Sequence, residues 1–161
     1  MKKLLFVMLA TSLVISTANA AVLHYDPSQL KQFEALGICV DCNLSGASIT
    51  GEHQQANIAQ TNFSDATITD ADFTESNFAN INGIHGLFHG NFSGSSFVQA
   101  TLLHADFTQA NLTYVDFTGA NVLGIDLAYA NLYGAKITAE QLAGAMDLCR
   151  AVLPDGSVGR C

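Results

Sequence analysis

The sequence predicts an all-β solenoid that is closed at each end by a short α-helical cap. Residues 42–51, 56–80 and 90–139 divide into 17 units of five residues. The third residue of every unit is apolar, and seven of the 17 are Phe; the first residue is small in 15 units, and the second is Asn or Asp in 12. Because a period of five fits neither the 3.6-residue turn of an α-helix nor the two-residue alternation of a strand, the chain must turn once per unit.

Each unit has a predictable orientation of its side chains. The first and third residues lie two apart on an extended segment, so both point inward, whereas the second points outward. The last two residues form a corner, where Gly, Thr, Asp and Asn favour turns. The aspartates at second positions are therefore interpreted as solvated surface residues rather than as acid–base pairs; they are Asp72, Asp106, Asp116 and Asp126.

The units also carry a family resemblance. Segments such as ADFTQ-ANLTY, ADFTE-SNFAN and ANLYG-AKITA resemble the pentapeptide-repeat family, whose signature is A(D/N)LXX. This resemblance implies a right-handed quadrilateral β-helix with four units per coil, in which stacked residues lie about 20 apart. The repeat region would then form about five coils and a rod of roughly 24 Å.

One register places nearly every apolar residue in four interior columns, and its interval shortens by a single residue where the blocks slip. The predicted columns are Ile58, Phe78, Phe97, Phe117 and Ile137; Ile49, Ile68, Phe88, Phe107 and Leu127; Phe73, Phe92, Leu112 and Leu132; and Leu44, Phe63, Gly83, Leu102 and Val122. The register predicts backbone defects or bulges at Gly83 and at Glu52–Gln55.

The ends of a solenoid need covering, and the flanking segments predict two caps. In the N-terminal cap, residues 21–41, Asp26 is the expected N-cap of a helix, with Pro27 in its first turn and Gln29 as capping-box partner. Leu30, Phe33 and Leu36 fall on one face of that helix, and Gly37 ends it. In the C-terminal cap, residues 140–161, the sequence 138–141 predicts a capping box and a helix to about Met146.

Four cysteines lie at the two ends of the predicted rod. A disulfide needs Cα atoms within about 7 Å, so we expect Cys39–Cys42 at the first coil and Cys149–Cys161 beyond the last. A redox motif and half of a zinc site are the alternatives for the CxxC pair. The redox motif normally opens a helix, whereas this pair follows one, and zinc needs two further ligands.

The N-terminal residues predict export. Lys2 and Lys3 precede an apolar run from Leu4 to Ile15, and small residues follow at 18 and 20. This pattern is typical of a signal peptide, residues 1–20, cleaved before Ala21, and it predicts a periplasmic or secreted protein. A membrane anchor is the alternative, but the run is too short to span a bilayer.

One group of residues suggests chemistry. The register places Asp65, His85 and His104 in one corner column on three successive coils, where they form either a divalent-metal or pH-sensitive patch or ordinary solvent-facing residues. Tyr114, Tyr129 and Tyr133 are also corner residues and suggest an exposed aromatic surface for a partner. No Gly-rich phosphate loop, HExxH or GxSxG motif occurs in the sequence.

The amino-acid composition argues against several classes of protein function. Hydrophobic residues make up 49% of the 161 residues, which excludes intrinsic disorder, and the net charge of −8 argues against binding nucleic acid or an anionic membrane. We expect a non-enzymatic, exported, acidic scaffold that binds a protein partner and needs no cofactor. The alternatives are a metal- or pH-responsive module at the three corner residues, a thiol-redox protein, and, from the family resemblance, a DNA mimic that interacts with gyrase.

Overall fold

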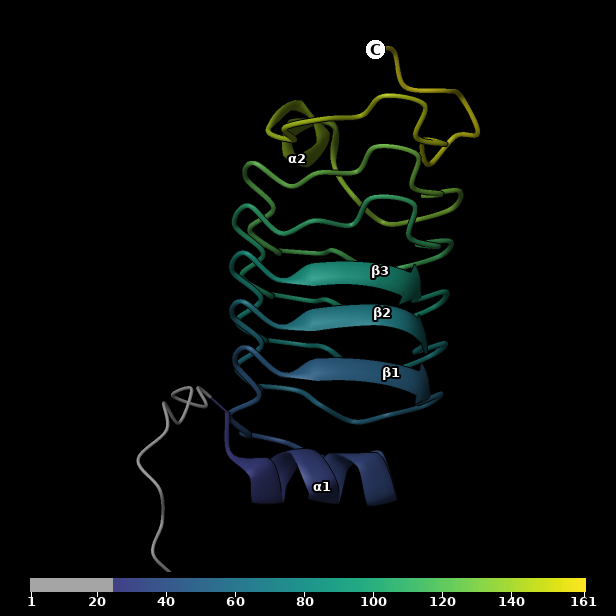
Figure 1. Cartoon of the computed structure of the whole chain (residues 1–161). Coiled ribbons are helices and arrows are strands. Elements are labelled where there is room, and N and C mark those ends of the chain that lie inside the picture. Colours follow the sequence, from purple (N-terminus) through teal and green to yellow (C-terminus); the bar gives the residue numbers. More distant parts are fainter. Residues whose placement is uncertain (1–24) are drawn as a thin grey trace, which may run out of the picture.

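The computed structural model describes residues 25–161, and these form a stack of coils with a helix at each end (Figure 1). The predicted signal peptide and its cleavage site lie outside the described residues. The elements in chain order are α1 (Pro27–Leu36), β1 (Ser48–Glu52), β2 (Thr67–Asp72), β3 (Leu87–Asn91) and α2 (Ala139–Ala143).

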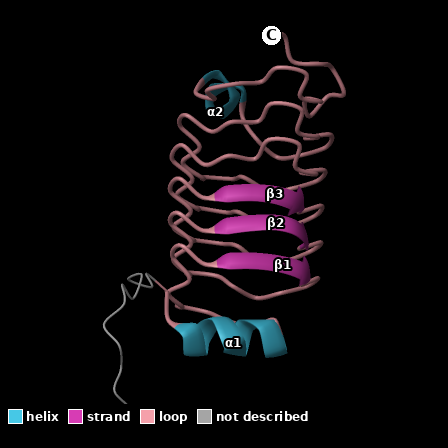
Figure 2. Ribbon diagram, viewed as in Figure 1, coloured by secondary structure: helices cyan, strands magenta, loops and turns pink. Residues whose placement is uncertain are grey.

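The coils pair with one another in parallel along the whole stack. β1, β2 and β3 form one parallel sheet in that order on one side of the rod, and the other sides pair through single bridges (Figure 2). One such series runs Ile38, Asn57, Asn77, Ser96, Asp116 and Lys136, which places one residue of each successive coil in line. The interval between successive members of this series is therefore the length of one four-sided coil.

The interior is filled by columns of stacked apolar side chains. Phe97 lies between Phe78 and Phe117, with ring centroids 4.5 and 5.5 Å away, and Phe88 stacks on Phe107 at 4.7 Å. Nine phenylalanines of the described chain are fully buried: Phe33, Phe63, Phe73, Phe78, Phe88, Phe92, Phe97, Phe107 and Phe117. Aromatic and aliphatic burial along one axis therefore supplies the main stabilisation of the rod.

The irregular positions of the backbone differ from those predicted. The pairing shifts by one residue between Ile49 and Gly51 in β1 and between Thr69 and Ala71 in β2, and the predictions at Gly83 and Glu52–Gln55 are wrong. At Gly83 the backbone stays regular because neighbouring side chains fill the space. A Cβ on Gly83 would lie 2.8 Å from Leu102 Cδ2 and 3.0 Å from Phe88 Cζ.

Helix α1 covers the open end of the first coil. Asp26 Oδ1 accepts a hydrogen bond from the Ser28 N–H at 2.8 Å, as an N-cap should. Phe33 is buried, with its ring 4.7 Å from His53 and 6.0 Å from Phe73, so it extends one interior column into the cap.

Two details predicted for α1 are wrong. The Gln29 side chain does not close a capping box, because its Oε1 accepts from the Asn43 N–H at 2.7 Å, a donor on the exposed edge of the first coil. Leu36 does not join the buried face and is 66% exposed, since it lies in the last turn of the helix, next to Gly37.

Helix α2 replaces one side of a further coil. Thr138 and Gln141 form the predicted capping box, but the helix ends at Ala143 rather than near Met146. The Met146 N–H donates to Ile125 O at 2.8 Å, and this bond returns the chain to solenoid pairing. The chain then adds two more sides, pairing Asp147 with Asp126 and Val152 with Asn131. Neither described helix has the length and apolar character needed to cross a membrane.

Candidate functional site

The corners of the coils present side chains in rows parallel to the rod axis. The fifth residue of most units has a positive φ, +57° at Asp65 for example, and the Ala66 N–H donates to Phe63 O at 3.0 Å across that turn. A positive φ at the third of four turn residues defines a type II turn. Because the same turn recurs one coil later, fifth-position side chains line up along each corner.

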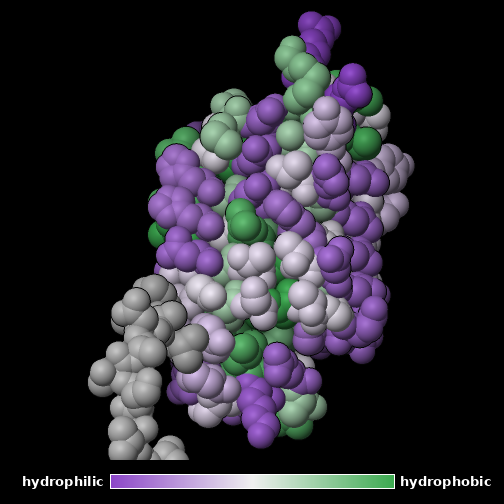
Figure 3. Space-filling view, viewed as in Figure 1, coloured by the Kyte–Doolittle hydropathy of each residue, from purple (hydrophilic) through white to green (hydrophobic). Residues whose placement is uncertain are grey.

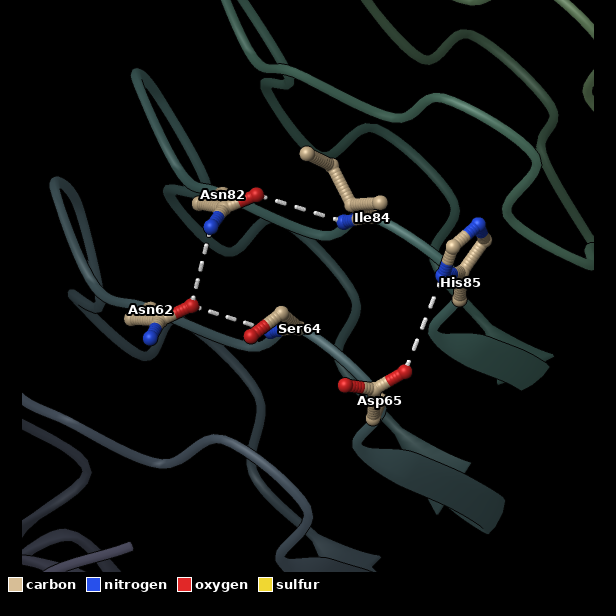
Figure 4. A network of polar contacts seen from close by, with 6 residues as sticks. All are labelled: Asn62, Ser64, Asp65, Asn82, Ile84 and His85. Carbon is tan, nitrogen blue, oxygen red and sulfur yellow. Dashed lines mark hydrogen bonds and ion pairs between the residues drawn. The ribbon is translucent and has the colours of Figure 1, made fainter. Parts of the chain in front are cut away.

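The residues at second positions also make hydrogen bonds within and between coils. In Figure 4, Asn62 Oδ1 accepts from the Ser64 N–H at 3.1 Å, and Asn82 Nδ2 donates to Asn62 Oδ1 at 3.1 Å. Each second-position oxygen thus closes an Asx turn over the corner, and the amides also link neighbouring coils. The second-position aspartates are partly exposed rather than fully solvated, and each accepts the N–H two residues ahead.

The Asx turns lower the pKa of several carboxyl groups. The pKa of Asp116 falls to about 2, chiefly through the hydrogen bond from the Thr118 side chain and then through Lys136, whose Nζ lies 2.9 Å from Asp116 Oδ2. Burial raises the pKa of Asp106, but hydrogen bonds from Thr108 outweigh it and the net direction is downward. These carboxylates therefore stay ionised well into the acid range.

The predicted metal or pH patch occupies one corner row. His85 Nδ1 lies 3.8 Å from Asp65 Oδ1 (Figure 4), and the rings of His85 and His104 stack at 5.8 Å between centroids. The three side chains follow one another along the axis and do not converge on a common point. Among residues 25–161, no three His, Cys, Asp or Glu side chains are arranged to share a metal ion.

Large corner side chains lie against glycines of the next coil. A Cβ on Gly124 would overlap the His104 ring, and a Cβ on Gly134 would lie 2.6 Å from Tyr114 Cδ1. Both glycines also have φ near +70°. Glycine at these positions therefore permits both the turn and the neighbour's ring.

One side of the rod carries the exposed tyrosines. We call this side the asparagine face, since Asn91, Asn111 and Asn131 follow one another along it, with Asn111 Nδ2 donating to Asn91 Oδ1 at 2.8 Å. Tyr129 precedes Asn131 at one corner, and Tyr133 follows it at the next. The side-chain neighbours of these two tyrosines are Arg150, 5.8 Å from the Tyr129 ring, and Tyr114, 6.0 Å from that of Tyr133.

The tyrosines are the large aromatic residues that the described chain exposes. Tyr114, Tyr129 and Tyr133 are 62%, 52% and 49% exposed, respectively. Figure 3, which shows one face of the molecule, is mostly hydrophilic, with apolar residues confined to small separate areas. The three exposed tyrosines therefore lie at two adjacent corners of the rod.

All four cysteines form disulfides within the caps. Cys39 bonds to Cys42, and Cys149 bonds to Cys161, with Cα atoms 5.5 and 4.3 Å apart. Cys39 and Cys42 are buried and follow the C-terminal end of α1 rather than opening a helix. This placement lacks the helix N-terminus that activates a redox thiol.

Comparison with known proteins identifies the repeats. Residues 54–82 and 91–122 match the family model for pentapeptide repeats, in eight copies. These residues are therefore pentapeptide repeats. No curated protein sequence matches the chain.

A solved pentapeptide-repeat structure shares the fold. The protein Rfr23 from the cyanobacterium Cyanothece 51142 superposes with a TM-score of 0.58 at 18% identity, over 70% of this chain and 95% of that one. HetL from Nostoc sp. strain PCC 7120, described as involved in heterocyst differentiation regulation, gives a TM-score of 0.49 at 14% identity, over 84% of this chain and 100% of its own. The predicted fold class, a right-handed quadrilateral β-helix with short helical caps, is confirmed.

Sequence reasoning missed one pair of residues in this pentapeptide-repeat solenoid. His89 Nε2 is buried and lies 3.1 Å from Asp106 Oδ1, although the alignment is not that of a hydrogen bond. The available signal was the four-residue interval between Phe88 and Phe92, where most units have five and Ile49 to His53 is also short. A missing corner residue predicts an irregularity at this corner, which can be either a bulge or a gap.

Proposed function

We propose that this chain is an exported, non-enzymatic scaffold that binds a protein partner through the asparagine face and its two tyrosine corners. The observation that carries the proposal is the exposure of Tyr114, Tyr129 and Tyr133 on a rod whose other aromatic rings are mostly buried. Tyrosine and arginine are enriched where protein interfaces gain most of their binding energy. Pentapeptide-repeat proteins are generally interaction proteins rather than enzymes.

The rigidity of the rod supports a scaffold role. Its interior is packed with stacked rings, its coils are joined by continuous parallel bridges, and each cap is closed by a disulfide. A surface held in this way is pre-organised, so a partner that binds it loses little of its free energy to ordering.

Two observations support export. Disulfides persist in oxidising compartments, and the described chain pairs all four of its cysteines. The N-terminal sequence has the pattern of a signal peptide. Cell fractionation with an antibody tests this part, and recovery of the protein in the cytoplasm with free thiols would refute it.

Photo-crosslinking tests the surface. A photoreactive residue at position 133 should capture a protein from the exported fraction, whereas the same residue at exposed Gln60, on a different corner, should not. The variant Tyr114→Asn/Tyr129→Asn, which keeps residues that accept a positive φ, should lower capture at least several-fold. The matched control is Gln60→Asn/Gln99→Asn, and equal capture by both double variants would contradict the proposal.

A further inference from the structure

A polar hollow opens beside β3, at the edge of the asparagine face. Its volume is about 450 Å³, and it is lined by side chains and backbone from three successive coils. We call it the β3 notch and define it by its lining: Asp70, Ala71, His89, Gly90, Asn91, Thr108, Gln109 and Asn111.

The notch exists because β3 lacks one residue. His89 pairs with Thr69 and Gly90 pairs with Ala71, so nothing in β3 corresponds to Asp70. Asp70 on the coil before and Gln109 on the coil after have the positive φ of corner residues, but the corner between them is absent. Two strand spacings, about 9–10 Å along the axis, therefore separate these two side chains.

The floor of the notch is closely packed backbone. A Cβ on Gly90 would lie 2.6 Å from Ala71 O, so no larger residue fits there without a shift of the chain. The hollow is consequently built into the coil path and does not depend on a side chain swinging away.

The walls of the notch are rich in acceptors and lack a cation. The Asp70 carboxylate has no hydrogen-bond or ion-pair partner within the described chain, and Asp106 approaches the notch through its contact with His89. Residues 32–135, which include the whole lining, contain no Lys or Arg. A Lys or Arg that pairs with the exposed Asp70 would therefore come from outside this stretch of chain.

The notch is continuous with the surface that we assign to the partner. Gln109 and Tyr129 occupy the same corner row, and the Gln109 N–H donates to Ala128 O at 2.9 Å. Asn91 and Asn111 belong both to the notch and to the asparagine face. A protein that covers Tyr129 and this face thus reaches the notch.

We propose that the β3 notch receives an arginine side chain of the protein partner, with the guanidinium bound by the Asp70 carboxylate. This inference rests on the proposed function, since it names the chemistry of one partner group. A planar guanidinium donates in a fork that suits a carboxylate, and charge-assisted bonds of this kind are strong. The notch lining holds no Phe, Tyr or Trp on which a sugar ring would stack, and this favours the cation.

An amide-proton NMR titration with N-acetyl-argininamide tests the notch without the partner. We expect saturable shifts at residues 70–71, 89–91 and 108–111, and an affinity about tenfold lower in Asp70→Asn, the loss typical of one charge-assisted hydrogen bond. Asp65→Asn is the matched control, because Asp65 lies on the same coil with the same charge and a similar φ. It should leave the affinity unchanged.

Three probes separate the alternatives. N-acetyl-citrullinamide, the neutral analogue of the arginine probe, should give no saturable shifts, and neither should glucose nor inorganic phosphate. Equal affinity in Asp70→Asn, equal binding of citrulline, or stronger binding of glucose or phosphate would overturn the assignment.

The crosslinking assay then separates the two proposals. If the native protein captures a partner from position 133 and Asp70→Asn weakens capture, both stand. If capture is the same in Asp70→Asn, the arginine assignment is wrong and the scaffold proposal survives. If nothing is captured from position 133, the scaffold proposal fails, and the probe titration alone decides whether the notch binds guanidinium.

Discussion

The middle and last coils follow the same path but carry their aromatic side chains on opposite sides of the wall. Phe78, Phe97 and Phe117 stack inside, whereas Tyr129 and Tyr133 lie outside on a coil whose interior holds Val122, Leu127 and Leu132. Position within the five-residue unit therefore decides what an aromatic ring does. At the third position it stabilises the rod, and at the corner it is available for binding.

The largest effect should come from emptying the interior column. Phe97→Ala removes a ring held between two others and should lower the free energy of unfolding by about 3–5 kcal/mol. Chemical denaturation monitored by circular dichroism measures this. A loss below about 1 kcal/mol would show that the ring does not support the column.

The C-terminal disulfide should come next. Cys161→Ser opens the 12-residue loop to Cys149 and should cost about 2–4 kcal/mol in the last segment. Each coil contacts only its neighbours, so hydrogen exchange should rise at residues 145–153 while amides around Phe97 remain protected. A uniform rise along the rod would contradict this local response.

A smaller effect should appear in acid. Since the pKa of Asp116 is lowered to about 2 from 3.8, its contribution is fully present above pH 4 and is lost as the pH falls from about 4 to 2. Asp116→Asn keeps the Asx turn and should cost about 1 kcal/mol at neutral pH, after allowance for solvent screening.

Acid titration of stability checks this prediction. The Asp116→Asn variant should depend less on pH between 4 and 2 than the native protein does. Asp126→Asn, at a residue that makes the same turn without a lysine partner, is the control. An unchanged acid profile in Asp116→Asn would contradict the assignment.

The smallest effect should come from the corner rings. Tyr129→Asn should change the free energy of unfolding by less than about 0.5 kcal/mol, because the ring is half exposed and the new residue accepts the same φ. Thermal unfolding measures this. A loss comparable to that of Phe97→Ala would remove the distinction between interior and corner aromatics.

The solenoid was predictable from the five-residue period of the sequence. Some features of its surface were not predictable from the spacing of nearby residues. The columns of Phe97 and Phe107 follow from counting one coil length along the chain, because packing leaves one register that buries every large side chain. Helix α2 ends early because the Met146 N–H finds a carbonyl on the coil below, and no local propensity reports such a bond.

The candidate site shows the same division. The exposed tyrosines could be inferred from their corner positions, whereas the β3 notch could not, since a missing residue between Phe88 and Phe92 produces either a bulge or a gap. Which one forms depends on how Gly90 packs against Ala71 O, a contact between neighbouring coils.

The contacts of His104 with Gly124 and of Tyr114 with Gly134 link a substitution at one corner position to the residue one coil further along the chain. Glu75 lies beside Gly94 and Gln99 beside Gly119, but a Cβ at either glycine would meet its neighbour at an ordinary 3.5 Å. His104 and Tyr114 thus restrict the residue one coil toward the C-terminus, whereas His85 accepts the large His104 ring one coil further along. A larger residue at Gly124 or Gly134 should therefore require a smaller side chain at position 104 or 114, one full coil upstream.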